Sequence, residues 1–157
     1  MCADGEICLT PIGRVVGGRS EPRDDRWGAE NAVVRLDRRQ YSADALRGLE
    51  DFSHVEVVYH FHLVADDAVE RVARRPRNNP AWPRIGVFAQ RGKKRPNRLG
   101  VSVCEIVSVD GLEVTVRGLD AVDGTPVLDL KPYMREFGPR GTLRQPSWVG
   151  ELMADYW

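Results

Sequence analysis

The sequence contains no long hydrophobic run, because no stretch of about 20 apolar residues is present to span a bilayer. It also has no excess of either charge, since its 23 basic and 23 acidic residues cancel. This balance disfavours a protein that binds nucleic acid over its whole surface, because binding of phosphates needs local positive charge. The length of 157 residues is typical of one compact domain. We therefore expect a single domain over 1–157 with no additional C-terminal domain.

Cysteine is scarce, and the three that occur, Cys2, Cys8 and Cys104, show no CxxC spacing. Their number and spacing indicate neither a disulfide framework nor a thiolate zinc site, so we expect small buried or terminal thiols. The first residues, Met1 to Gly5, lack the basic region and the apolar run of a signal peptide. This absence predicts a cytoplasmic location.

The common nucleotide-binding fingerprints are also missing, because no GxGxxG opens a helix after a strand and no Walker-type GK[ST] occurs. A Rossmann-type fold is therefore not expected.

What the chain does contain is a series of short segments rich in β-branched and aromatic residues. We predict strands at 7–16, 32–37, 54–63, 85–89, 101–109, 112–116 and 125–130. Helical spacing predicts short helices at 42–51 and 66–75 and a last helix at 148–156. The pair Asp110-Gly111 predicts a hairpin with a type I′ turn. Many short strands separated by turns indicate a mainly β fold, either a small β-barrel or a strongly curved sheet.

Three histidines, His54, His60 and His62, share parity on the segment 54–63, so their side chains project from one face of a strand. That spacing is compatible with metal ligands. A histidine on a strand is more often hydrogen-bonded structure, and a bare HxH is a weak metal signal. No metal site is predicted, and a metal-binding module is kept as an alternative.

Two clusters of charge stand out. The segment 84–98 carries six basic residues and no acidic one, which fits either a phosphate or carboxylate partner or a solvated basic loop. The second cluster comprises Asp120, Asp123, Asp129 and Lys131 within an apolar run. Charged residues at that density in a β core need partners, so both structural pairing and a functional site remain open.

Three blocks resemble a known family. FSHVEVVYHFH at 52–62, GVFAQRGKKRPNRLGVSV at 86–103 and LDAVDGTPVLDLKPY at 119–133 are similar, in order and spacing, to the TrmO-like family of tRNA methyltransferases. The resemblance runs from about residue 11 to residue 133. One departure lies in EPRDDRWGAE at 21–30, where Asp24 follows Pro22-Arg23 in place of the glutamine of the family's PRQ-like segment.

The resemblance implies an all-β, non-Rossmann domain that binds S-adenosylmethionine and is usually a homodimer, with the cofactor near the subunit interface. The implied activity is N6-methylation of threonylcarbamoyladenosine next to the anticodon of tRNA. Two alternatives stay open: a small-molecule methyltransferase on the same fold, and a non-catalytic S-adenosylmethionine- or metal-binding module.

The resemblance also implies roles for particular residues. The cofactor pocket would be formed by His62, Leu63, Arg91, Val101, Arg117, Gly118, Leu119 and Asp120. We assign Arg91 to the methionine carboxylate of the cofactor and Asp120 to its donor groups. Candidate general bases are Asp123, His60 and Tyr133. The tRNA would be held by Lys93, Lys94, Arg95, Asn97 and Arg98, with Trp82 either stacked on a base or packed within its own loop.

Overall fold

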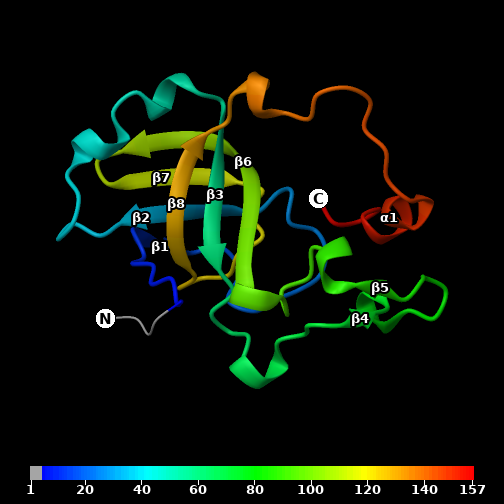
Figure 1. The fold of residues 1–157 in the computed structure, drawn as a ribbon. Helices are drawn as coiled ribbons and strands as arrows, with labels where there is room; N and C mark the ends of the chain where they lie inside the picture. The colour runs from blue at the N-terminus through cyan, green and yellow to red at the C-terminus, as the bar shows by residue number, and fades with distance from the viewer. Residues whose placement is uncertain (1–4) are drawn as a thin grey trace.

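The computed structural model describes residues 5–157, and its main feature is a closed antiparallel β-barrel (Figure 1). The strands follow the order β1-β2-β7-β6-β3-β8 around the barrel. Their bounds are β1 Gly13–Val16, β2 Asn31–Leu36, β3 His54–His60, β6 Leu99–Asp110, β7 Glu113–Arg117 and β8 Pro126–Pro132. The prediction of a mainly β fold is confirmed, and of the two architectures it left open, a small barrel or a strongly curved sheet, the chain forms the barrel.

A small second layer stands beside the barrel. It consists of a two-stranded sheet, β4 (Ala73–Arg74) with β5 (Ile85–Gly86), and one short helix, α1 (Ser147–Leu152). Figure 1 shows both on the same side of the barrel, with the C-terminus between α1 and the barrel. Single 3₁₀ turns fill the connections at Ala43–Leu46, Leu49–Asp51, Asp66–Ala68, Pro76–Asn78, Val87–Ala89, Pro96–Arg98 and Arg135–Phe137.

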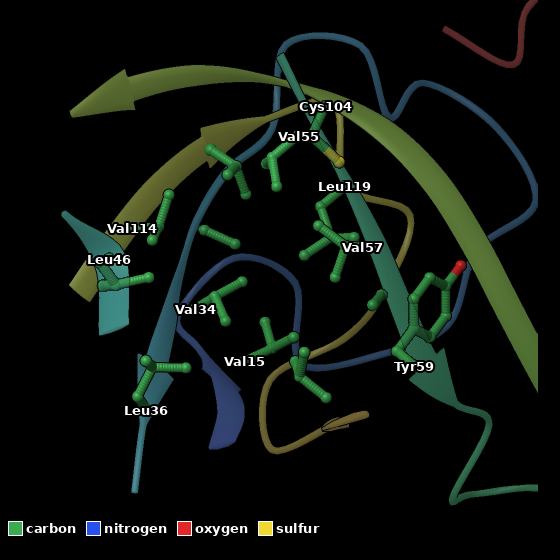
Figure 2. Close-up of a cluster of buried hydrophobic side chains, with 14 residues drawn as sticks. Val15, Val34, Leu36, Leu46, Val55, Val57, Tyr59, Cys104, Val114 and Leu119 are labelled. Atoms are coloured by element: carbon green, nitrogen blue, oxygen red, sulfur yellow. The ribbon is translucent and has the colours of Figure 1, made fainter. Parts of the chain in front are cut away.

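Strand alternation builds the core. In β3, Val55, Val57 and Tyr59 are buried inside the barrel, whereas His54 and His60 face outward. Further buried aliphatic side chains come from the other strands, including Val15, Val34, Val114, Val116 and Val127. Full burial of each such side chain stabilises the fold by about 1.5–3 kcal/mol. Figure 2 shows Tyr59 at one edge of this cluster, with its hydroxyl oxygen pointing away from Val15 and Val34.

The prediction of a helix at 66–75 is wrong. Only the 3₁₀ turn Asp66–Ala68 forms there. The following backbone is used in tertiary hydrogen bonds instead, because the amide of Glu70 donates to the carbonyl of Lys94 and β4 pairs with β5. Long-range pairing has therefore overridden local helical spacing.

The other two predicted helices are shorter than expected. The segment 42–51 forms two 3₁₀ turns separated by Gly48 at φ +87°, and Ser42 makes no side-chain cap. The last helix ends at Leu152, because the carbonyls of Asp155 and Tyr156 accept hydrogen bonds from the amides of Arg26 and Trp27.

The hairpin between β6 and β7 has a different turn from the one predicted. Asp110 pairs with Glu113, so the two loop residues are Gly111 and Leu112. Gly111 has φ +57°, and Leu112 is not among the residues with positive φ. Glycine alone at the first central position is typical of a type II′ turn, so the type I′ prediction is wrong.

The cysteines and the search for a membrane-spanning helix complete the comparison with the sequence. Cys104 is a buried free thiol, as expected, whereas Cys8 is disulfide-bonded, which corrects the expectation of a simple thiol there. Cys2 lies outside the described residues. Within residues 5–157, no helix has the length and apolar character needed to cross a membrane.

Candidate functional site

The carboxylate of Asp120 lies at one end of the barrel, on the connection between β7 and β8, and three hydroxyl groups converge on it. Tyr59 from β3 donates to Oδ1 at 2.8 Å, and Ser102 from β6 donates to the same oxygen. Tyr156 from the C-terminal segment donates to Oδ2. Asp120 is thus a partly buried carboxylate that accepts three hydroxyl donors. These four residues, Asp120, Tyr59, Ser102 and Tyr156, form the Asp120 cluster.

Burial and charge keep two of these donors protonated. Burial raises the pKa of Tyr59 above its usual range, and the negative charge of Asp120 adds to the shift. Burial and the same carboxylate also raise the pKa of Tyr156, while the nearby cations of Arg91 and Arg77 act in the opposite direction. Both phenols therefore remain hydrogen-bond donors to Asp120 at neutral pH.

Two residues predicted to bind the cofactor, Arg91 and Val101, contact each other, and Val101 precedes Ser102, the β6 donor to Asp120. Arg91 is exposed and its Nη2 donates to the carbonyl of Val101 at 2.8 Å. The positive charge of Arg91 also acts to lower the pKa of Tyr156, the residue that donates to Oδ2 of Asp120. His62 follows the end of β3, and a Cβ built on Gly124 would lie 3.9 Å from its Nε2. Leu63 beside it is 60% exposed.

The remaining members of the predicted pocket are placed differently. The side chain of Arg117 lies on the outer surface, where it contacts Glu105 at 3.2 Å and Asn31 at 3.3 Å. Leu119 is part of the barrel core, with 1% exposure. Gly118 adopts φ +80°, and its carbonyl accepts a hydrogen bond from the thiol of Cys104. In this segment, only Asp120 directs a side chain to the cluster.

The three candidate bases do not form one group. Tyr133 donates its amide to the carbonyl of His54, so it lies at the opposite end of β3 from His60, about 20 Å away along a strand of this length. Asp123 shares the Asp120 end of the barrel, but its Oδ1 accepts the amide of Gly17 at 2.8 Å. Burial lowers the pKa of His60, and the positive charge of Arg98 lowers it further.

The basic segment 84–98 divides into two sets. Arg95 and Arg98 support the loop: Arg95 donates to the carbonyl of Gln90, and Arg98 donates to the carbonyl of Val64 and pairs with Asp66 at 2.8 Å. Arg84, Lys93 and Lys94 are exposed, and none of the described hydrogen bonds or ion pairs involves their side chains. Asn97 is exposed at φ 62°.

Trp82 is packed rather than available for stacking. Its side chain is 9% exposed, and its indole N–H donates to Glu151 of α1 at 2.8 Å. Of the two roles considered for this residue, the structure supports packing within the Pro-rich loop.

The divergent loop 19–30 is ordered by its own contacts. Arg19 pairs with Glu30 at 2.8 Å and lies 4.3 Å above the ring of Trp27, which is 4% exposed. Asp25 receives Arg77 through both guanidinium amino groups, at 2.6 and 3.0 Å. The amides of Gly118 and Asp123 donate to the carbonyls of Glu30 and Arg19, so the loop lies along the segment that carries Asp120.

Sequence reasoning missed Tyr59, Ser102 and Tyr156. Ser102 had a usable signal, because it is the polar residue among the inward positions of β6, between Gly100 and Cys104. The parity of Tyr59 opposite to His60 indicates an inward side chain, but not its partner. No local pattern marks Tyr156.

Two other features of the described residues bear on the choice of site. A surface depression of about 940 Å³ lies at the far end of the barrel, lined by four arginines and by acidic residues, and it contains none of the predicted site residues. Between residues 5 and 157, no three histidine, cysteine or acidic side chains are grouped so as to hold a metal ion.

A closed antiparallel barrel with a three-hydroxyl carboxylate at one end defines a small, mainly β class of protein that is distinct from Rossmann-type enzymes. Residues 19–138 match the model of the tRNA-methyltransferase O N-terminal domain, and the chain belongs to that family.

Relatives and a solved structure agree with this placement. A probable S-adenosyl-L-methionine-binding protein of Pyrococcus abyssi is 34% identical over 143 residues, covering 88% of this chain and 74% of the relative. The tRNA (adenine(37)-N6)-methyltransferase of Escherichia coli is 43% identical over 108 residues, covering 66% of this chain and 46% of that enzyme. A crystal structure of TrmO aligns with TM-score 0.71 and 31% identity, covering 89% of this chain and 63% of the other.

The predicted family and fold class are confirmed, and the predicted enzyme class and cofactor agree with the names of these relatives. The chain spans less than two thirds of the E. coli enzyme and of the TrmO structure.

Proposed function

We propose that this chain is an S-adenosylmethionine-dependent methyltransferase that modifies the N6 of threonylcarbamoyladenosine next to the anticodon of tRNA. The observation that carries the proposal is the Asp120 cluster beside Arg91 and Val101, in a chain of the tRNA-methyltransferase O family. A cytoplasmic location and a homodimeric state belong to the same proposal.

The residues present fit the proposed cofactor. Asp120 is an acceptor for the ammonium or ribose hydroxyl groups of S-adenosylmethionine, and Arg91 is an exposed guanidinium for its carboxylate. Leu63 and Val101 are apolar side chains that are 60% and 37% exposed, and they offer surface for the adenine ring. When bound, the sulfonium cofactor supplies an activated methyl group.

The protein's part in the reaction is alignment and proton removal. The bound cofactor would supply the methyl group and keep the sulfur as the leaving thioether, and a base on the chain would accept the proton that N6 gives up. Orientation contributes up to roughly 7–11 kcal/mol in favourable cases. Among the three candidates, His60 suits the base role best, because its lowered pKa keeps the imidazole unprotonated at neutral pH. Asp123 instead holds the turn near Gly17, and Tyr133 lies at the other end of β3.

The phosphates of the tRNA would bind to the basic segment 84–98. The exposed side chains of Arg84, Lys93 and Lys94 allow this binding to be tested. The substitutions Arg84→Gln, Lys93→Gln and Lys94→Gln, made together, remove three exposed charges without touching the supports Arg95 and Arg98. Binding of threonylcarbamoylated tRNA should weaken, and the dependence of log affinity on log salt should flatten by about two units, given roughly 0.7 per phosphate on single strands.

A matched control removes three exposed arginines elsewhere, Arg14, Arg38 and Arg140, and should leave binding closer to that of the parent. Methyl transfer itself is measured by mass spectrometry of digested tRNA nucleosides. If the parent chain fails to methylate this tRNA while it binds S-adenosylmethionine, a small-molecule acceptor replaces tRNA in the proposal.

The homodimer would use the outer face of β6. Leu99, Val101 and Val103 point outward in a row and are 36%, 37% and 43% exposed. Exposed aliphatic side chains aligned on one strand are typical of an interface. In a dimer with two-fold symmetry, the same row of a second copy would pack against this row and bury both. Val103→Glu should shift the chain to a monomer in light scattering, whereas Val72→Glu, at a position 67% exposed, should not. A parent chain that is monomeric at micromolar concentration contradicts the dimer.

A further inference from the structure

The C-terminal segment reaches back to the Asp120 cluster and is anchored at three points. Glu151 in α1 accepts the indole N–H of Trp82 at 2.8 Å. The carbonyls of Asp155 and Tyr156 accept the amides of Arg26 and Trp27, each at 2.8 Å. The phenol of Tyr156 then donates to Oδ2 of Asp120. These anchors join the segment to the divergent loop, to the Pro-rich loop and to the proposed site.

Gly28 shows how closely the segment is seated. A Cβ on Gly28 would lie 2.7 Å from the main-chain carbon of Trp157 and 3.2 Å from its Cα. No side chain fits between these two backbones, since real Cβ atoms do not approach that closely. The loop 19–30 is therefore shaped to receive this segment, which gives its divergent sequence a structural role.

The hydrogen bonds leave Asp120 with one free acceptor position on the oxygen that faces the segment. A carboxylate oxygen has two lone-pair positions. On Oδ1 both are taken, one by Tyr59 and one by Ser102. On Oδ2 Tyr156 takes one and, among the described residues, no other donor takes the second. The carboxylate therefore has its plane fixed by hydroxyls on both sides and offers a single direction to a ligand donor.

We propose that the segment 146–157 completes the cofactor site and that Tyr156 is a positioning residue, which orients Asp120 so that one lone pair of Oδ2 meets a donor group of the cofactor. This inference rests on the proposed function, because it takes S-adenosylmethionine as the ligand. It adds a specific contribution from a part of the chain outside residues 19–138, the range that matches the family domain.

The test is a double-mutant cycle on cofactor affinity. Tyr156→Phe removes the hydroxyl and keeps the ring, and isothermal titration with S-adenosylmethionine should show affinity weakened by about tenfold. Asp120→Asn should weaken binding further. In the Asp120→Asn background, adding Tyr156→Phe should change affinity less than twofold, because the phenol then has no carboxylate to orient. A merely structural role for Tyr156 predicts the same loss in both backgrounds.

Two further variants keep the test decisive. Gly28→Ala leaves Tyr156 intact but displaces the segment, and it should reproduce the tenfold loss. Tyr41→Phe removes a phenol that packs against the core near Leu36 and Leu46, and this variant should bind as the parent does.

The possible results separate the two proposals. A parent that binds S-adenosylmethionine and a Tyr156→Phe variant with unchanged affinity overturn the positioning role alone. Tighter binding by Tyr156→Phe also overturns it, since the phenol would then compete with the ligand for Oδ2. A parent that does not bind the cofactor overturns the proposed function, and the positioning role with it.

Discussion

Gly100 is the partner of Tyr59 across the β3–β6 ladder, and the space where its side chain would lie is occupied by the Tyr59 ring. A Cβ at position 100 would come within 2.4 Å of Cε2 and 2.5 Å of Cζ of that ring. The absence of a side chain at Gly100 therefore allows the phenol to lie flat over β6 and reach Asp120. Both residues belong to sequence blocks whose spacing predicted the family, and the structure supplies the physical reason for their pairing.

Gly100→Ala should destabilise the protein and disturb the Asp120 cluster. The added methyl group forces Tyr59 away from its position, at a cost of about 1–3 kcal/mol typical of overpacking. Urea unfolding monitored by circular dichroism measures the change. Gly92→Ala is the control, because a Cβ at Gly92 meets nothing within 4 Å. Equal stability of the two variants contradicts the proposed clash.

The stability of the fold should decline in mild acid because of His60. Its pKa is lowered in the folded state by burial, then by Arg98 and His62, with Asp66 acting in the opposite direction. As pH falls through about 6.5, His60 therefore becomes protonated in the unfolded chain, whereas in the folded protein it is protonated only at lower pH. Unfolding free energy measured at pH 7.5 and 5.5 should fall less in His60→Asn than in the parent. Parallel pH profiles would exclude this contribution.

Cys104 should be inert toward thiol reagents in the native protein. Burial, followed by the charge of Asp120, raises the pKa of its thiol to about 12, so the reactive thiolate is nearly absent at pH 8. Labelling with iodoacetamide and peptide mapping should show modification of Cys104 only in urea. Rapid labelling under native conditions would show that the barrel opens at β6.

Arg91→Ala should weaken S-adenosylmethionine binding by about 1.5–3 kcal/mol, the usual contribution of a hydrogen bond to a charged group. The fold should remain intact, because Arg91 is exposed and its side chain donates to the backbone carbonyl of Val101. Titration calorimetry checks the affinity, and Arg84→Ala, another exposed arginine in the same loop, serves as the control. An Arg91→Ala variant that binds like the parent removes this side chain from the pocket.

Alternation along the strands was the most informative part of the sequence. The parity of His54 and His60 in 54–63 predicted one shared face, and both side chains do face outward in β3, which leaves Val55, Val57 and Tyr59 on the buried face of the strand. Predictions based on local helical spacing were weaker. The segment 66–75 uses its backbone to pair with Lys94 and β5, and this alternative is invisible to a pattern that considers neighbours only.

The sequence by itself determined the mainly β class, the family and the position of Asp120 in a charged run, because these depend on residue type, order and spacing. It left open whether the strands close into a barrel or form a curved sheet. Only the tertiary structure decided which groups hold Asp120. Tyr59 is 61 residues from it along the chain and Tyr156 is 36 residues from it. Such contacts arise when the barrel closes and the C-terminal segment seats against Gly28, and no local rule of propensity or periodicity specifies where those two backbones meet.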